Sequence, residues 1–309
     1  MARSVAELPQ GARMTDYISL GVIASRFPGE EVKRVLAETD RASKRHRDLP
    51  AHVVVYYVIA LALYMQVSCR EVLRCLLEGV QWLTGPERPI NVTGRAGISQ
   101  ARARVGSEPV KRLHDRIVGP IAQRSVERDT KGAWYRKWRV VSLDGSTLDV
   151  ADTRENAEAF GRPGASRGQS AYPQIRFVAL VENGTHVLFG SQMGGYHLGE
   201  PTLSEEIYRC LQADMLALAD RNFFSYEGWK KASATGTALV WRVKKNLLLP
   251  CLKRLEEGSY LSKVYPSVRA VSRITGVVLR RSRRFRRMLS PSRPGVRGAW
   301  PFPFGFFLN

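Results

Sequence analysis

Cysteine is scarce in this sequence of 309 residues and follows no ligand pattern. The four cysteines form no Cys-x-x-Cys pair, and no histidine cluster lies beside them; they are Cys69, Cys75, Cys210 and Cys251. Neither a zinc site nor a disulfide framework is therefore expected. Reduced thiols suit a cytoplasmic protein, and the N-terminal residues MARSVAELPQGARMTDY contain no apolar signal core.

Long apolar runs are missing as well. The longest, VVVYYVIALALYM over residues 53–65, has 13 residues, whereas a membrane-spanning helix needs about 20. We expect a fully buried helix there and no membrane partner.

Acidic residues are in short supply. The 48 Lys and Arg against 28 Asp and Glu leave a formal net charge of +20, which favours a polyanionic partner, usually nucleic acid. A basic protein without such a partner is the alternative. Residues 258–309 contain ten Arg, one Lys and no Asp or Glu, so the rest of the chain carries less than half of this charge.

The first part of the chain has helical periodicity. Apolar residues at three-and-four spacing predict helices over residues 16–26, 30–38, 53–65 and 70–80.

A basic segment follows these helices. Ser99 is expected to cap a helix carrying Gln100, Arg102 and Arg104, and Gly106 should end it before another helix begins at Glu108. This order is typical of a helix-turn-helix that presents Gln100 and Arg102 to DNA. A solvated basic helix face is the alternative interpretation.

The pattern changes to strands near Trp134. Strands are predicted at 137–143, 147–150, 175–181, 186–190, 215–219 and 237–243, with helices over 201–213 and from Ser225 to about residue 234. Asn183-Gly184 is a strong hairpin signal. This order indicates a ribonuclease-H-like fold, a mixed sheet with helices on its faces. A further β-rich piece is expected over 247–265.

Two aspartates each follow a buried strand. Asp144 comes after 137–143 and Asp220 after 215–219, and in the expected topology these strands are neighbours. Phosphodiester chemistry needs divalent ions such as Mg²⁺ or Mn²⁺ on rigidly held carboxylates. A single strand-end Asp is ordinary turn chemistry, and Asp149 and Asp152 compete for the first position. Asp144 is favoured because the apolar run ends there.

Several separated segments resemble the DDE transposases of the insertion sequence 4 family. They are SLDGSTLDVADTRENAEAFGRPGASRGQSAYPQIR, LALADRNFFSYEGW and LVWRVKKN; ISLGVIASRFP and LPAHVVVYYVIALALY resemble that family's N-terminal domain. The resemblance covers residues from about 15 to 266. It implies metal-dependent cleavage and strand transfer of insertion-sequence ends, with Asp144 and Asp220 as the first two catalytic acids and metal ligands.

The resemblance also implies partners and a location. Transposon terminal repeats and target DNA would be bound, with two copies of the chain paired in a synaptic complex on the bacterial nucleoid. Phosphate contacts are expected at Arg162, Arg167 and Lys244, for each of which exposed surface charge is the alternative.

The family's third acid has no counterpart here. It is a glutamate on a late helix, within Tyr-x-x-Arg-x-x-x-Glu-x-x-x-x-x-x-Lys, whereas the last acidic residue of this chain is Glu257. The Arg-rich end is either a basic arm for DNA phosphates or the product of a frameshift in a GC-rich gene. The frameshift is favoured because the resemblance fades near residues 268–276.

The sequence thus predicts an α/β protein in three parts. These are a helical, DNA-binding N-terminal domain over residues 1–125, an incomplete RNase H-like catalytic core over 134–266 and an Arg-rich tail over 267–309. We expect this copy to be inactive in strand transfer. A non-catalytic DNA-binding regulator and a metal-dependent nuclease or resolvase are the competing functions.

Overall fold

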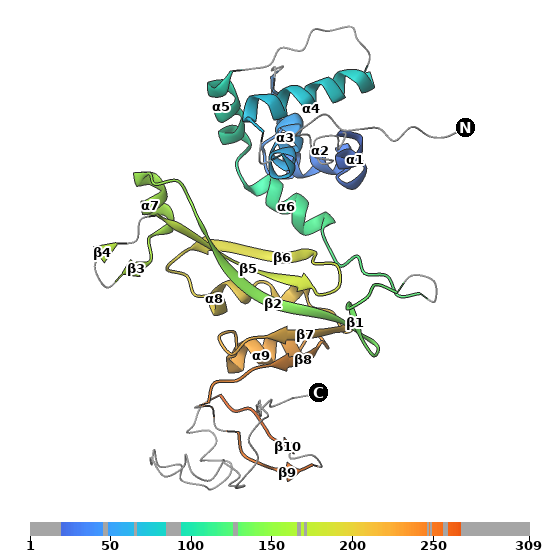
Figure 1. Ribbon diagram of the computed structural model, residues 1–309, viewed down its shortest axis with the longest axis vertical. Helices are drawn as coiled ribbons and strands as arrows, with labels where there is room; N and C mark the ends of the chain where they lie inside the picture. The colour runs from blue at the N-terminus through green and yellow to red at the C-terminus, as the bar shows by residue number, and fades with distance from the viewer. Residues whose placement is uncertain are drawn as a thin grey trace, which may run out of the picture. The chain divides into compact units, whose positions relative to one another are not determined.

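The computed structural model describes residues 20–45, 49–64, 67–84, 94–125, 129–165, 168–169, 172–245, 247, 249–255 and 259–266. The chain divides into two compact units, residues 1–118 and 119–309, each of which is described by itself (Figure 1). The first unit is helical and the second contains a mixed β-sheet with helices. The chain is therefore an α/β protein, as predicted.

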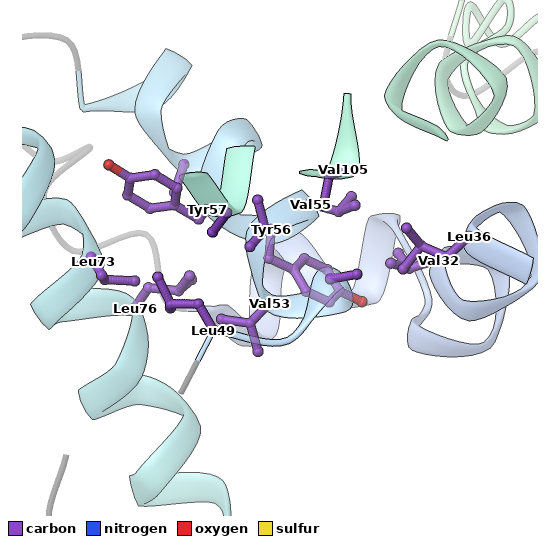
Figure 2. Close-up of a cluster of buried hydrophobic side chains, with 14 of the residues drawn as sticks. Val32, Leu36, Leu49, Val53, Val55, Tyr56, Tyr57, Leu73, Leu76 and Val105 are labelled. Atoms are coloured by element: carbon purple, nitrogen blue, oxygen red, sulfur yellow. The ribbon is translucent and has the colours of Figure 1, made fainter. Parts of the chain in front are cut away.

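The first unit is built around one buried helix. Its helices are α1 (Leu20–Arg26), α2 (Gly29–Glu38), α3 (Ala51–Leu63), α4 (Cys69–Thr84), α5 (Arg95–Val105) and α6 (Glu108–Ile117). The helices α2, α4 and α5 all contact α3, and Figure 2 shows buried side chains gathering around it. A helix that contacts others on several sides is apolar all round, which explains the continuous apolar run.

The two tyrosines of α3 are buried, and their hydroxyl groups are hydrogen-bonded. Tyr56 Oη donates a hydrogen bond to the Phe27 carbonyl at 2.6 Å, and Tyr57 Oη donates to the Cys69 carbonyl at 2.9 Å. Burial raises the pKa of Tyr57 to about 12. A largely buried helix is confirmed, but it is not fully buried as predicted, because Ala62 and Leu63 at its end are exposed. No helix in the described part of the chain is long and apolar enough to cross a membrane.

The basic helix α5 begins earlier than predicted. Gly94 is its N-cap residue, and the Ile98 amide donates to the Gly94 carbonyl at 3.1 Å. Ser99 therefore lies inside the helix, and its prediction as the cap was wrong. The apolar stripe of α5 begins before Ser99, because Ile98 is buried together with Ala101 and Val105. The predicted end is confirmed: Gly106 is the C-cap with φ +71°.

The second unit contains a sheet in the order β6-β5-β2-β7-β8, with β1 beside β2 (Figure 1). The strands are β1 (Trp134–Tyr135), β2 (Trp138–Asp149), β5 (Gln174–Glu182), β6 (Leu188–Gly195), β7 (Met215–Ala219) and β8 (Ala238–Trp241). In this order β5 is antiparallel to β2 and β6, whereas β2, β7 and β8 are parallel. The expected adjacency of the two strands before the aspartates is confirmed.

The two faces of the sheet differ in burial. Side chains alternate along a strand, and in the middle of the sheet one set is buried: Val141, Leu143, Val178, Leu180, Met215, Ala217, Ala219, Leu239 and Trp241. We call this the covered face. Helix α9 (Tyr226–Ser233) and the 3-10 turn η2 (Tyr208–Cys210) pack there, since Trp229 and Tyr208 contact the Trp241 ring at centroid distances of 5.5 and 5.8 Å.

The other set of side chains forms what we call the open face, which is exposed along the second half of β2, whereas Ala179, Leu216 and Ala238 on the same face are buried. Along β2 it comprises Ser142, Asp144, Ser146 and Leu148, of which the last three are exposed. Leu148 is 53% exposed, and Met193 on β6 is 60% exposed.

Two segments differ from the prediction. Strand β2 continues through Asp144 to Asp149, because it stays in antiparallel register with β5 along that whole length; the stretch 147–150 is not a separate strand. The helix predicted over 201–213 is shorter. Helix α8 (Glu200–Ser204) gives way to η2, where the amides of Ile207, Cys210 and Leu211 bond three residues back instead of four.

The loop after β2 and the last segment contain small elements. Helix α7 (Arg154–Phe160) precedes a short hairpin of β3 (Gly164–Ala165) and β4 (Gly168–Gln169). The expected β-rich piece is present as β9 (Lys253–Arg254) paired with β10 (Tyr260–Leu261). Residues 256–258, between these two strands, and the Arg-rich segment 267–309 lie outside the described residues.

Candidate functional site

Asp144 and Asp220 follow register partners in two neighbouring parallel strands. Leu143 of β2 pairs with Ala219 of β7, and each aspartate is the next residue along its chain. Neighbouring strands lie about 4.8 Å apart, so the two backbone positions are held close together by the sheet itself. Asp144 stands on the open face, and both side chains are exposed.

Each aspartate uses one carboxylate oxygen locally. Asp144 Oδ1 accepts a hydrogen bond from the Gly145 amide at 2.8 Å, and Asp220 Oδ1 accepts from the Arg221 amide at 2.7 Å. Asp220 Oδ1 also lies 3.2 Å from Arg242 Nη1. Within the described ranges, Oδ2 of neither aspartate has a hydrogen-bond or ion-pair partner, so each carboxylate keeps one oxygen available for a cation.

The two rival aspartates are engaged elsewhere. Asp149 Oδ1 accepts a hydrogen bond from Gln174 Nε2 at 2.7 Å, across the β2–β5 pair. Asp152 forms an ion pair with Arg162. Asp149 also lies beyond the last residue of β2 that pairs with β7. Asp144 is therefore the aspartate of this segment that the fold places beside Asp220.

A third carboxylate contacts the segments of both aspartates. Glu200, the first residue of α8, accepts a hydrogen bond on Oε2 from Asn222 Nδ2 at 2.6 Å. Its Oε1 lies 2.9 Å from the point where a Cβ on residue 145 would be.

Sequence reasoning missed Glu200, Asn222 and Arg242. Asn222 stands inside a motif quoted for the resemblance, but its hydrogen-bond partner is 22 residues away. The one local signal was Gly145, because a glycine inside a strand often marks a close approach by another group.

The three predicted DNA-binding residues of α5 are all exposed, but they do not point the same way. At 3.6 residues per turn, Arg104 lies about 40° around the helix from Gln100, whereas Arg102 lies about 200° from it. Gln100 and Arg104 thus share one side of the helix, and Arg102 stands on another.

The cations of α5 and α6 differ in their surroundings. On α6, Lys111 pairs with Asp115 at 2.6 Å and Arg112 with Glu108 at 2.8 Å. In the part of the first unit that the structure describes, neither Arg102 nor Arg104 has a carboxylate partner. Among the described residues, Arg102 and Arg104 therefore present uncompensated positive charge. The cations of α6 are paired, Lys111 and Arg112 within the helix and Arg116 with Glu38 of α2.

Two of the three predicted phosphate contacts of the second unit, Arg162 and Lys244, lie among the described residues. Arg162 follows α7, and its side chain is 19% exposed in the ion pair with Asp152. Lys244 is exposed, three residues after the end of β8. Arg167 lies outside the described residues.

The described acidic residues of the second unit do not form a complete metal site. Among the described residues, no group of three His, Cys, Asp or Glu side chains is arranged to hold a metal ion. Asp144 and Asp220 thus supply two carboxylates without a third ligand of these types. What the arrangement offers a cation is two exposed oxygens at one end of a rigid parallel pair.

The first unit is similar to a known protein family. Residues 17–115 match the family described as insertion element 4 transposase N-terminal. The resemblance expected from the sequence is confirmed.

Two Escherichia coli K12 proteins extend the likeness into the second unit. The chain is 26% identical over 238 residues to InsZ, a transposase by name, which covers 77% of this chain and 73% of InsZ. It is 24% identical over 250 residues to the transposase InsG for insertion sequence element IS4, which covers 80% of this chain and 54% of InsG. The chain spans about half the length of InsG. Both matches are much longer than the first unit.

Proposed function

We propose that this chain is built for the DNA chemistry of a transposase, the metal-dependent cleavage and joining of insertion-sequence ends. The observation that carries the proposal is the register pair Leu143–Ala219, which sets Asp144 and Asp220 at the same end of two parallel strands. Carboxylates at such a position are held rigidly enough to serve as ligands of divalent ions. The relatives described above are transposases by name.

The sheet supports an RNase H-like core. Its order β6-β5-β2-β7-β8, with β5 antiparallel to the other four strands, agrees with the arrangement expected from the sequence. A helix carrying a third acid, as the family resemblance implies, would meet Asp144 on the open face of such a sheet.

The donor set fits Mg²⁺ or Mn²⁺ in part. Both ions prefer carboxylate oxygens and keep several waters, and Asp144 and Asp220 each have an oxygen to offer. When bound, the ions would activate the attacking hydroxyl and stabilise the leaving oxygen of the phosphodiester. The chain's own part is to hold the two carboxylates in place; Arg242 balances the charge of Asp220 until a cation arrives.

The incomplete acid set bears on activity. Residues 258–309 contain no Asp or Glu, and the described residues contain no three-ligand group. We infer that a polypeptide of these 309 residues binds DNA and holds a divalent ion weakly, but does not transfer strands. We also propose that two copies of the chain bind paired insertion-sequence ends on the bacterial nucleoid.

A non-catalytic regulator is the second candidate. It is favoured by Arg102 and Arg104 of α5, which have no carboxylate partner among the described residues and present charge to DNA without any need for the aspartates. Such a protein would occupy transposon ends through its first unit.

One experiment separates these functions. The 309-residue protein is mixed with DNA carrying the ends of its insertion sequence, and binding and cleavage are measured with Mn²⁺ and with EDTA. We expect DNA binding without strand transfer. Binding that metal enhances would support the transposase, whereas binding that needs no metal and survives Asp144→Ala and Asp220→Ala would support the regulator. Robust cleavage that Asp144→Ala abolishes and Asp149→Ala preserves would contradict the inactive assignment.

A further inference from the structure

Glu200 approaches the backbone of β2 at the residue after Asp144. Its Oε1, Cδ and Cγ atoms lie 2.9, 3.1 and 3.2 Å from the place that a Cβ at residue 145 would occupy. No side chain larger than hydrogen fits there without displacing the carboxylate. Glycine weakens a strand interior, and Gly145 leaves the space that the Glu200 carboxylate occupies.

The other oxygen of Glu200 holds the segment after β7. Oε2 accepts the 2.6 Å hydrogen bond from Asn222 Nδ2, two residues after Asp220. One carboxylate therefore touches the segments of both aspartates, which are joined otherwise by the strand pairing that ends at Leu143 and Ala219.

The side-chain alternation of β2 shows on which side of the strand Glu200 lies relative to the Asp144 carboxylate. Residue 145 points to the covered face, like Leu143, whereas Asp144 stands on the open face. Glu200 therefore supports the backbone of Asp144 from the face opposite its carboxylate. It is placed to act on the position of the aspartate and not to share a cation with it.

We propose that Glu200 is a positioning residue that fixes the spacing of Asp144 and Asp220. Its packing on Gly145 holds β2, and its hydrogen bond to Asn222 holds the loop that follows β7. Metal ligands must be held within about 0.5 Å of their working geometry. The pairing of β2 with β7 stops one residue before each aspartate, so Glu200 adds support at the point where this pairing ends. The role rests on the proposed function of the two aspartates, but the contacts themselves can be tested without it.

Hydrogen–deuterium exchange on the full chain tests the contacts. Three variants are compared with the wild type: Glu200→Ala, Glu200→Gln, and Glu206→Gln as a control. Glu206 is a nearby exposed glutamate whose ion pair with Arg209, at 3.4 Å, touches neither aspartate segment. Glu200→Ala should speed exchange about 5- to 10-fold in peptides containing Gly145 and Asn222, the effect of one lost hydrogen bond.

The glutamine variant identifies the contact responsible. Glu200→Gln keeps an oxygen that accepts from Asn222, so its exchange should stay within about 2-fold of the wild type. Unchanged exchange in Glu200→Ala, or a Glu200→Gln variant that behaves like Glu200→Ala, would overturn the proposal.

A double-variant cycle tests the link between Gly145 and Asn222. In Gly145→Ala the new methyl group displaces the Glu200 carboxylate, so exchange should also rise at Asn222, on the other strand's segment. Adding Glu200→Ala to Gly145→Ala should then change the Asn222 peptide little further, because the same contact is already lost. Additive effects of the two changes would show that Gly145 and Asn222 are not coupled through Glu200.

Mn²⁺ titration separates failure of this proposal from failure of the proposed function. If the wild-type protein binds no Mn²⁺, or if Asp144→Asn leaves Mn²⁺ binding unchanged, the proposed metal function is contradicted. The exchange data then still decide the role of Glu200. If Mn²⁺ binding depends on the aspartates, Glu200→Ala should lower the Mn²⁺ affinity about 10-fold, because removal of a residue that orients a metal ligand has an effect of this size. Glu200→Gln should change it little. An unchanged affinity in Glu200→Ala, or an equal loss in Glu200→Gln, would overturn the positioning role.

Discussion

Leu143 and Ala219 are the last register partners of the parallel strands β2 and β7, and each is followed directly by an aspartate. The separation of Asp144 and Asp220 is therefore set by strand pairing and not by a flexible loop. Strand pairs inside a sheet keep their spacing through backbone hydrogen bonds. A pair of carboxylates built in this way remains in place whether or not a cation is bound.

The first prediction concerns these two carboxylates. Asp144→Asn and Asp220→Asn each remove a charged ligand while keeping the side-chain shape, so each should weaken Mn²⁺ binding at least about 10-fold. The free energy of unfolding should change by no more than about 0.5 kcal/mol, because both side chains are exposed. Isothermal titration and chemical denaturation measure the two quantities.

The matched control is Asp149→Asn on the same strand. Asp149 bonds to Gln174 and lies outside the β2–β7 pair, so its loss should leave Mn²⁺ affinity unchanged. An equal effect of Asp149→Asn would mean that the ion responds to general negative charge and not to the register pair.

The second prediction concerns Arg242, whose Nη1 lies 3.2 Å from Asp220 Oδ1. A cation that binds Asp220 must compete with this guanidinium. Arg242→Gln should therefore tighten Mn²⁺ binding, by about 2- to 5-fold, since exposed ion pairs are weak. The effect should shrink in high salt, which screens exposed charges. Arg209→Gln, which breaks the exposed pair with Glu206, is the control; weaker Mn²⁺ binding in Arg242→Gln contradicts the competition.

The third prediction concerns Glu182, which is fully buried at the end of β5. It pairs with Arg139 and accepts hydrogen bonds from the Ile121 and Ala122 amides at 3.0 and 2.9 Å. Burial alone raises the pKa of Glu182, but the hydrogen bonds from Thr185, Ile121 and Arg139 outweigh it, so the pKa lies below its ordinary value of 4.5.

A depressed pKa in the folded state fixes the pH dependence. The stabilisation is fully present above the ordinary pKa of 4.5 and is lost as the pH falls through the lower folded-state pKa. Glu182→Gln should lower the free energy of unfolding by about 3 kcal/mol near pH 7, because Arg139 loses its buried partner. The variant should also lose less stability than the wild type below pH 4.5. Denaturation curves at several pH values measure both effects.

The control for Glu182 is an exposed pair. Glu158 is paired with Arg154 at 2.7 Å on α7, and Glu158→Gln should cost less than about 1 kcal/mol. Similar costs for the two variants would show that the buried network does not carry the stability assigned to it.

Much of this fold follows from local sequence patterns. The run Met215–Ala219 is buried on both faces and reads as a strand, and Ser225 caps α9 by accepting a hydrogen bond from the Gly228 amide at 3.0 Å. Both were predicted because their signals are local. The extension of β2 through Gly145-Ser146-Thr147 was not, because these residues carry no apolar pattern and are held by their partners on β5.

The candidate site divides in the same way. Asp144 and Asp220 were found because each follows an apolar strand, and their adjacency followed from the expected topology. Glu200 and Arg242 come from a helix and a strand end whose places depend on tertiary packing. Helix α5 shows a third case: the residue types were identified, but the spacing of Gln100 and Arg102 puts them on different sides.

The last prediction uses that geometry of α5. If α5 lies against DNA with the side that carries Gln100 and Arg104, Arg104→Ala should remove one phosphate contact. The dependence of log affinity on log salt would then become shallower by about 1. Arg102→Ala should leave this slope unchanged, since Arg102 faces elsewhere. Fluorescence anisotropy with end-containing DNA at several salt concentrations measures the slope.

Two further variants complete the test. Gln100→Ala removes no charge, so it should lower the preference for end DNA over random DNA without changing the salt slope, because amide side chains read base edges. Arg112→Ala on α6 is the control for charge, since Arg112 is already paired with Glu108 and has little to offer a phosphate. Equal slope changes in Arg102→Ala, Arg104→Ala and Arg112→Ala would mean that DNA senses the overall charge of the first unit. Helix α5 would then present a solvated basic face and would not be a DNA-recognition helix.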